Sequence, residues 1–192
     1  MKKEDKYKSI KEAQKRLVES KRDLLHGVDH ASMVVENAFN IIRSEKLDVD
    51  SDVVELVCWW HDIEFKEPKK NRNRPCVYTA KYLAKKFGSK ESIIIDSISN
   101  HEFGNMPKSM EGKVLYDADK IEYVNLNRLQ KVYDYFDMGL LTKDYVLSVI
   151  NQVLKVFYPE VAKNLNFDYS KKIFNKKRPK AEKLLYEIRS YV

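Results

Sequence analysis

A nearly continuous apolar stretch runs from Val53 to Ile63 and is interrupted only by Glu55, His61 and Asp62. At a period of 3.6 residues this segment is apolar almost all round, which is typical of a helix inside a core. His61 and Asp62 stand at the end of the stretch, and an imidazole and a carboxylate are costly to bury. A metal ion would satisfy both groups at once. Neighbouring helical residues point about 100° apart, so further ligands must come from elsewhere in the chain.

The rest of the pattern predicts an all-α protein, because apolar residues recur at helical spacing and strand-like alternation is hard to find. The predicted helices cover about 5–25, 30–42, 53–63, 76–87, 89–99, 113–136 and 142–157, a short piece after Pro159, and 179–191. The isoleucines at 93–95 and 98 would also suit a strand. We expect N-caps at Asp29, at Ser51 or Asp52, and at Ser89, and we expect Pro179 in the first turn of the last helix.

Length and composition are those of a globular protein with one main core. We expect a helical core domain over residues 1–136 and a C-terminal helical extension, packed on that core, over 137–192. No apolar run approaches membrane-spanning length, and no apolar stretch follows the basic residues at the N-terminus, so we expect no membrane partner and no secretory signal. Two cysteines, Cys58 and Cys76, do not make a disulfide framework. These features favour the cytoplasm.

The formal net charge of +7 points to anionic partners, meaning phosphorylated small molecules or nucleic acid. Much of the excess lies near the C-terminus, in Lys171, Lys172, Lys176, Lys177, Arg178, Lys180 and Lys183. A solvated helix face is the alternative interpretation of this run.

Three of the four histidines, His30, His61 and His101, stand where a predicted helix begins or ends. Their order, with Asp62 and a later aspartate, resembles the HD-domain metal-dependent phosphohydrolase superfamily, in particular its small single-domain bacterial and archaeal type. The resemblance covers about Leu24 to Val132. It rests on His26-Gly27-Val28-Asp29-His30, the apolar lead-in to His61-Asp62-Ile63, Thr79-Ala80, Ile98-x-x-His101, and the passage from Glu111 to Lys120 that contains Asp117-Ala118-Asp119.

The resemblance implies a helical bundle in which His30, His61, Asp62 and Asp119 bind a metal. Two imidazoles and two carboxylates suit Mn²⁺, Fe²⁺, Ni²⁺, Co²⁺ or Mg²⁺. Dinuclear members of the superfamily supply another histidine after the His-Asp pair, and residues 64–78 contain none, so we expect one ion. Members of the branch also tend to carry an arginine three residues after the first histidine, where this chain has Met33.

The implied reaction is hydrolysis of a phosphomonoester, such as a nucleotide, by a metal-activated water. Asp62 would serve both as a ligand and in catalysis. His101 is a candidate general acid or phosphate donor, and a helix-end histidine bonded to carbonyl groups is the alternative. Candidate substrate-binding cations are Arg72, Arg74 and Lys120, and candidate outer residues around the ligands are Asp117, His26 and Glu102.

Two other functions fit the same pattern. The chain could be a non-catalytic helical scaffold, or a nucleic-acid-binding protein that uses its basic C-terminal region. It could also be a metal-dependent enzyme outside phosphate chemistry, such as a lyase or an oxygenase.

Overall fold

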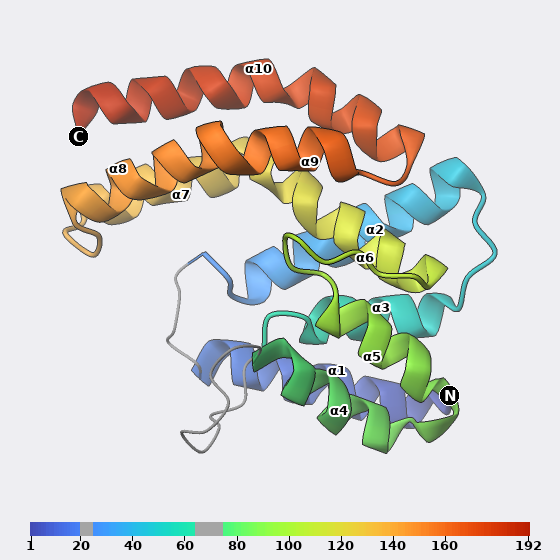
Figure 1. Ribbon diagram of the computed structural model, residues 1–192. Coiled ribbons are helices and arrows are strands. Elements are labelled where there is room, and N and C mark those ends of the chain that lie inside the picture. The colour runs from blue at the N-terminus through green and yellow to red at the C-terminus, as the bar shows by residue number, and fades with distance from the viewer. Residues whose placement is uncertain (20–24, 64–74) are drawn as a thin grey trace. The chain divides into compact units, whose positions relative to one another are not determined.

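The computed structural model describes residues 1–19, 25–63 and 75–192, and within these ranges every regular element is a helix (Figure 1). The all-α prediction is therefore confirmed, and the isoleucine-rich segment is helical. The described residues form two compact units, Met1–Asp119 and Lys120–Val192. The expected boundary between a core domain and a C-terminal extension, after residue 136, falls near the end of the helix Leu126–Asp137 and stays a prediction.

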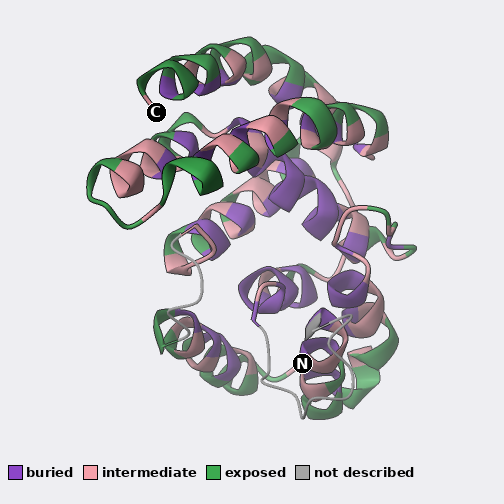
Figure 2. Ribbon diagram, turned by 60° about the vertical axis from the view of Figure 1, so that its left-hand side comes forward, coloured by how far each residue is buried: buried purple, intermediate pink, exposed green. Residues whose placement is uncertain are grey.

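The first unit is built around α3, in which seven of the ten residues are buried apolar side chains. Its elements are α1 (Lys3–Glu19), α2 (Val28–Glu45), α3 (Ser51–Trp60), α4 (Pro75–Lys86), the 3₁₀ turn η1 (Gly88–Lys90), α5 (Glu91–Ser99) and α6 (Met110–Lys120). Helices α1, α2 and α5 pack on α3, and α4 packs on α5. Every residue of α3 from Leu56 to Trp60 is buried (Figure 2). The helix expected inside a core is therefore confirmed.

The helix N-termini differ from the predicted caps. Helix α2 begins at Val28 after Gly27, so Asp29 lies in its first turn, where a negative charge favours the helix dipole. Asp50 caps α3 by accepting a hydrogen bond from the Val53 amide at 3.2 Å, in place of Ser51 or Asp52. Ser89 lies within η1 and caps nothing, because α5 follows without a side-chain cap. Each change lengthens a helix or moves its start by one to three residues.

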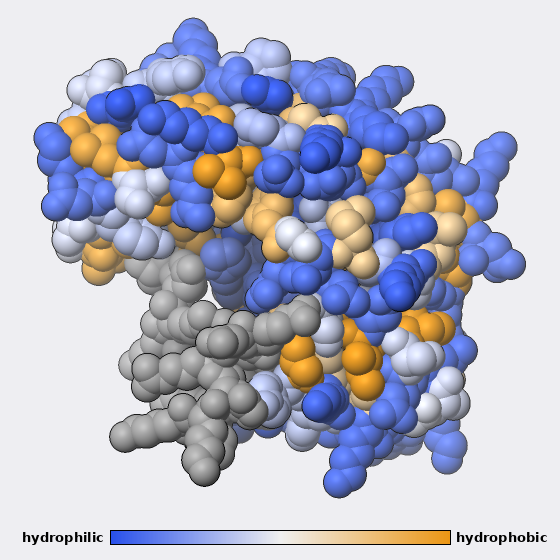
Figure 3. Space-filling view, viewed as in Figure 1, coloured by the Kyte–Doolittle hydropathy of each residue, from blue (hydrophilic) through white to orange (hydrophobic). Residues whose placement is uncertain are grey.

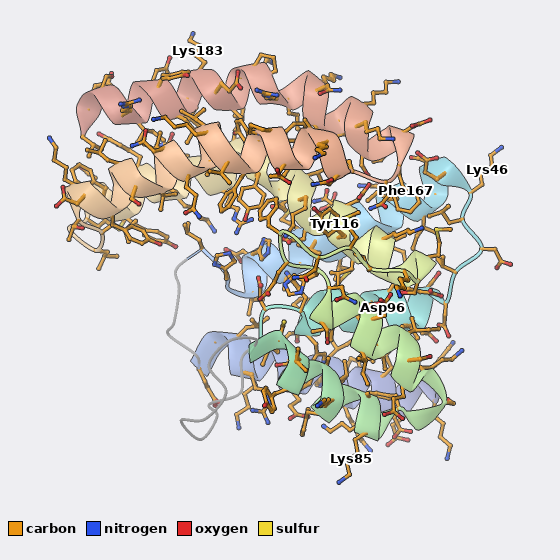
Figure 4. All side chains as sticks on the ribbon, in the orientation of Figure 1. Lys46, Lys85, Asp96, Tyr116, Phe167 and Lys183 are labelled. Atoms are coloured by element: carbon orange, nitrogen blue, oxygen red, sulfur yellow. The ribbon has the colours of Figure 1, made fainter. Side chains whose placement is uncertain are left out.

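The connection between α5 and α6 is anchored by Asp96 (Figure 4). Its carboxylate accepts hydrogen bonds from the backbone amides of Lys108 and Ser109, at 2.9 and 2.7 Å, and from the Ser109 hydroxyl at 2.6 Å. Burial of Asp96 opposes its ionisation, but these bonds outweigh it and lower its pKa. The anchor matters because α6, which starts here, carries Asp119 at its other end.

The second unit consists of η2 (Ile121–Val124), α7 (Leu126–Asp137), α8 (Lys143–Gln152), the π-helical segment η3 (Val153–Phe157), α9 (Tyr158–Asn164) and α10 (Asp168–Tyr191). The single helix predicted over 113–136 is wrong. It is broken at Asn125, whose extended backbone and side-chain oxygen cap α7 through the amides of Asn127 and Arg128. Asparagine competes well for backbone amides, so apolar periodicity continues across a break that it creates.

The last helix also differs from the prediction, since α10 begins at Asp168 and contains Pro179 within it. A proline inside a helix costs about 3 kcal/mol. Burial of Phe174, Ala181 and Leu185 on either side of the proline offsets this cost. None of the described helices combines the length and apolar character that crossing a bilayer requires.

Gly112 provides a test of the packing at the start of α6. An alanine Cβ there would lie 2.6 Å from Pro107 Cβ and 2.8 Å from Ser109 Oγ. Alanine normally favours a helix over glycine by about 1 kcal/mol, but this overlap reverses the sign. We expect Gly112→Ala to lower the free energy of unfolding by about 1–3 kcal/mol in urea titrations.

The matched control is Gly88→Ala, because a Cβ at Gly88 would meet no atom within 4 Å. We expect its stability to stay within about 0.5 kcal/mol of the parent. Equal effects of the two substitutions would contradict the packing at Gly112.

Hydrogen bonds to the Glu12 side chain join α1 to α4 in the first unit. Its carboxylate accepts hydrogen bonds from Lys86 at 2.5 Å, Tyr82 at 2.8 Å and Arg16 at 2.8 Å. Burial raises the pKa of Glu12, but these donors outweigh burial and lower it to about 2. The Lys86 and Arg16 cations also lie against aromatic rings, at 4.5 and 5.7 Å from the centre of Tyr82.

The stability contributed by Glu12 should therefore depend on pH. A lowered folded-state pKa means that the contribution is complete above the ordinary glutamate value, near 4.5, and is lost as pH falls toward about 2. We expect Glu12→Gln to destabilise the protein by about 1 kcal/mol at pH 7, allowing for solvent screening, and by less below pH 3. Thermal unfolding across this range measures the difference. Glu19→Gln, at an exposed position of the same helix, should show no such trend.

Candidate metal centre

Four polar side chains from three helices of the first unit meet in one place, and we call them the His-Asp cluster: His30, His61, Asp62 and Asp119. His30 is the third residue of α2, His61 and Asp62 follow the last turn of α3, and Asp119 is next to last in α6. His30, His61 and Asp119 are only 5%, 2% and 7% exposed, and the Asp62 side chain is 21% exposed. Residues separated by up to 89 positions thus share one small volume.

The distances in the His-Asp cluster are short. His30 Nε2 lies 3.2 Å from Asp62 Oδ2 and 3.3 Å from Asp119 Oδ1. His61 Nε2 lies 3.1 Å from Asp62 Oδ2, 3.9 Å from Asp119 Oδ1 and 3.3 Å from His30 Nε2. Ligand atoms about 2.1 Å from an ion lie roughly 3.0 Å apart in an octahedral shell and about 3.4 Å apart in a tetrahedral one. The shorter distances, 3.1–3.3 Å, fall in this range and the His61–Asp119 distance of 3.9 Å exceeds it, so His30, His61 and Asp62 form the group that could hold a metal ion.

The His61 ring is oriented by the helix that it follows. Its Nδ1 lies 2.7 Å from the Cys58 carbonyl oxygen, so a neutral ring donates its Nδ1 proton there and leaves the Nε2 lone pair facing the cluster. His101 has the same arrangement, with Nδ1 2.7 Å from the Ile98 carbonyl oxygen. In both cases the acceptor is the third residue before the histidine. A hydrogen bond from Nδ1 to a backbone carbonyl oxygen fixes the tautomer in which the Nε2 lone pair is free to bind a metal.

Two buried polar atoms of the cluster lack a hydrogen-bond partner among the described residues, namely His30 Nδ1 and Asp62 Oδ2. The Asp62 oxygen lies 3.2 Å from His30 Nε2 and 3.1 Å from His61 Nε2, yet it accepts no hydrogen bond from a described residue. A buried carboxylate oxygen without a donor is costly. A cation between it and the two nitrogens would remove that cost.

The electrostatics favour an ionised Asp62. Burial raises its pKa, but the nearby rings of His61, His101 and His30 outweigh burial and hold the pKa well below the usual value. The reverse holds for His61, where burial lowers the pKa and the carboxylates of Asp62 and Asp119 raise it above the usual range. Asp62 therefore keeps its negative charge, and its carboxylate favours a positive charge beside it, at His61.

Two further histidines border the cluster. His101 is 5% exposed, packs edge to face on His61 with ring centres 5.2 Å apart, and places Nε2 3.9 Å from Asp62 Oδ1. His26 packs edge to face on His30 at 5.5 Å. Glu102 follows His101 and is partly exposed. All four histidines of the chain therefore lie in or beside this site.

Other candidates from the sequence are less closely tied to the cluster. Asp117 is fully buried in α6, but residues two apart on a helix point about 200° apart, so it does not share the face of Asp119. Lys120 is 3% exposed and belongs to the second unit. Arg72 and Arg74 lie outside the described residues. The substrate-binding and orienting roles of these residues stay predictions.

Sequence reasoning missed the groups that hold the site together. Asn37, two turns after His30 on α2, donates a hydrogen bond to the Ala118 carbonyl oxygen at 3.3 Å and so ties α2 to α6 beside Asp119. Glu111, at the start of α6, accepts from the Asp50 amide at the start of α3 at 3.1 Å. One signal was available for Asn37, because it lies seven residues after His30 and therefore on the same helical face.

Comparison with known proteins identifies the fold and no family. No protein-family model matches the chain, and no curated protein matches it. A solved structure from Lactobacillus plantarum is similar, with a TM-score of 0.70, 16% identity, and coverage of 100% of this chain and 98% of that one. Another, from Listeria innocua, has a TM-score of 0.56 and 19% identity, and covers 95% and 94%. Both are structural genomics targets, and at these identities the likeness extends to the fold alone.

Proposed function

We propose that this chain is a metal-dependent phosphohydrolase of the HD type that acts on a phosphomonoester, such as a nucleotide. The observation that carries the proposal is the convergence of His30, His61, Asp62 and Asp119, in which the two imidazole Nε2 atoms lie 3.1–3.9 Å from the carboxylate oxygens. A structural histidine needs one partner, whereas here two imidazoles and two carboxylates face one another. Burying two carboxylates this close together costs free energy unless a cation lies between them.

The donor set fits one divalent ion. Two neutral imidazole nitrogens and two carboxylates suit a borderline or hard ion such as Mn²⁺, Fe²⁺, Ni²⁺, Co²⁺ or Mg²⁺, and four protein ligands leave positions open in an octahedral shell. When bound, such an ion polarises a phosphoryl oxygen and makes its water acidic. Asp62 contributes by staying ionised, and His61 contributes by holding its Nε2 lone pair inward through the bond to Cys58.

We propose that His101 is the general acid that donates a proton to the leaving group. Its Nδ1 lies 2.7 Å from the Ile98 carbonyl oxygen, and its Nε2 lies 3.9 Å from Asp62 Oδ1. A histidine held in this way can give a proton to the oxygen of a departing alcohol. We propose Arg72, Arg74 and Lys120 as the cations that balance charge on the phosphoryl oxygens.

The ligand assignment is tested by Asp62→Ala. Removing the ionised carboxylate should lower metal affinity by at least about 100-fold, measured by titration calorimetry with Mn²⁺ and by elemental analysis, and should abolish phosphatase activity. Asp29→Ala, which removes an exposed carboxylate next to His30, is the matched control and should keep both. Full metal occupancy in a folded Asp62→Ala protein would refute the assignment.

The role of His101 is tested by His101→Gln, using two substrates that differ in their leaving group. We expect kcat on an alkyl phosphate to fall by about 10²-fold or more, with metal content unchanged. The loss on 4-nitrophenyl phosphate should be much smaller, because nitrophenolate leaves without a proton. Equal losses on both substrates would assign His101 to phosphate binding instead. A screen with Mn²⁺, Co²⁺ and Ni²⁺ in which no phosphoester is hydrolysed would contradict the proposed reaction.

A further inference from the structure

The net charge of the chain is concentrated on one helix. Residues 1–119 hold 22 basic and 21 acidic side chains, a net charge of +1, whereas α10 alone holds eight basic and three acidic side chains, a net charge of +5. Residues 171–180 contain six basic residues and no acidic one. The +7 of the whole protein is therefore mostly a property of α10.

Four lysines of α10 form a single row, which we call the lysine stripe: Lys172, Lys176, Lys180 and Lys183. They occupy positions i, i+4, i+8 and i+11, so their directions fall within about 80° of one another and the row is roughly 16 Å long. All four are exposed, and by helical spacing they lie on the side opposite the buried Phe174, Ala181 and Leu185. Lys183 projects outward from the ribbon in Figure 4.

Acidic side chains of the protein neutralise little of the positive charge of the lysine stripe. Lys183 approaches Glu187 at 3.7 Å, but Lys172, Lys176 and Lys180 form no ion pair with any described residue. Helix α1 is the contrast, since it has six basic and four acidic residues. There, i to i+4 pairs join Lys8 to Glu4 at 2.6 Å and Lys15 to Glu19 at 3.7 Å. Helix α10 also pairs Lys171 with Asp168 at 3.4 Å and Arg178 with Glu182 at 2.7 Å, but this pairing does not extend to the side of the helix that Lys172, Lys176 and Lys180 occupy.

We propose that the lysine stripe binds the phosphate backbone of a nucleic acid. Along the axis of a duplex each strand presents a phosphate about every 3.4 Å, so a row of roughly 16 Å runs past about five of them. Tyr186, three residues after Lys183 and 57% exposed, offers a ring face on which a base can stack.

An anionic membrane is the less favoured partner for this helix. An interfacial helix needs an exposed apolar face beside its basic one. The apolar face of α10 is already buried by packing on α7, α8 and α9 within the same unit. Side chains along α10, at the top of the view in Figure 3, are mostly hydrophilic.

The test measures fluorescence anisotropy of labelled 20-nucleotide oligouridine and of a 20-base-pair DNA duplex, in EDTA so that metal-dependent turnover plays no part. If the four lysines contact phosphates, the logarithmic salt slope on the single strand should be about −2.8, and the affinity should fall about 50-fold between 50 and 200 mM salt. Changing Lys172, Lys176, Lys180 and Lys183 together to Gln should lower the affinity at 50 mM salt by at least about 10-fold and flatten this slope.

The control changes Lys3, Lys8, Lys11 and Lys15 of α1 to Gln, which removes the same charge from exposed positions of another helix. Its affinity should stay within about three-fold of the parent, and circular dichroism should report the same fold for both variants. The proposal is overturned if the α1 variant weakens binding equally, if neither oligonucleotide binds at 50 mM salt, or if vesicles containing phosphatidylserine bind while both oligonucleotides do not.

Discussion

The burial of ionisable groups at the end of α3 is the constraint on which the first unit depends. Taking a carboxylate out of water costs several kcal/mol even after the protein relaxes. The unit accepts this cost at Asp62 and again at Asp119, which lie beside the two buried imidazoles of His30 and His61. The imidazoles stabilise the ionised form of Asp62, and the carboxylates favour positive charge on His61, so the cluster is one electrostatic unit and not four separate residues.

Such a cluster depends on three helices keeping their relative positions to within about 0.5 Å. The polar contacts away from the cluster serve this need. Asn37 fixes α2 against the C-terminal end of α6, while Asp96 and Glu111 fix the other end of α6 against α5 and the start of α3. Helix α6 is thus held at both ends, and Asp119 is carried by a helix that has little freedom to shift. The packing of Gly112 against Pro107 belongs to the same arrangement.

The sequence predicts the parts of this protein that local chemistry determines. The apolar run of α3 required a buried helix, and the pattern of histidines at helix ends indicated residues that the fold does bring together. Helix breaks were harder to predict, because apolar periodicity is continuous across Asn125 and only the competition of its side chain for backbone amides interrupts the helix. Pro179 was predicted in the first turn of the last helix, where proline is common, but it lies inside α10. Here tertiary burial of the neighbouring apolar residues stabilises the helix on both sides of a residue that usually begins one. The contacts of Asn37 and Asp96 depend on positions more than ten residues away and have no local signal.

The two kinds of charge in this chain obey different physics. In the His-Asp cluster the charges are buried and lie within 4 Å of one another, so mobile ions at the surface screen them little. On α10 the charges are exposed and largely unpaired, so at physiological salt their field extends only about 8 Å and is available to a partner that comes into contact. A chelator therefore acts on the first and added salt acts on the second. Since neither treatment reaches the other group, the hydrolysis proposed for the cluster and the binding proposed for the lysine stripe can be tested separately in the same protein.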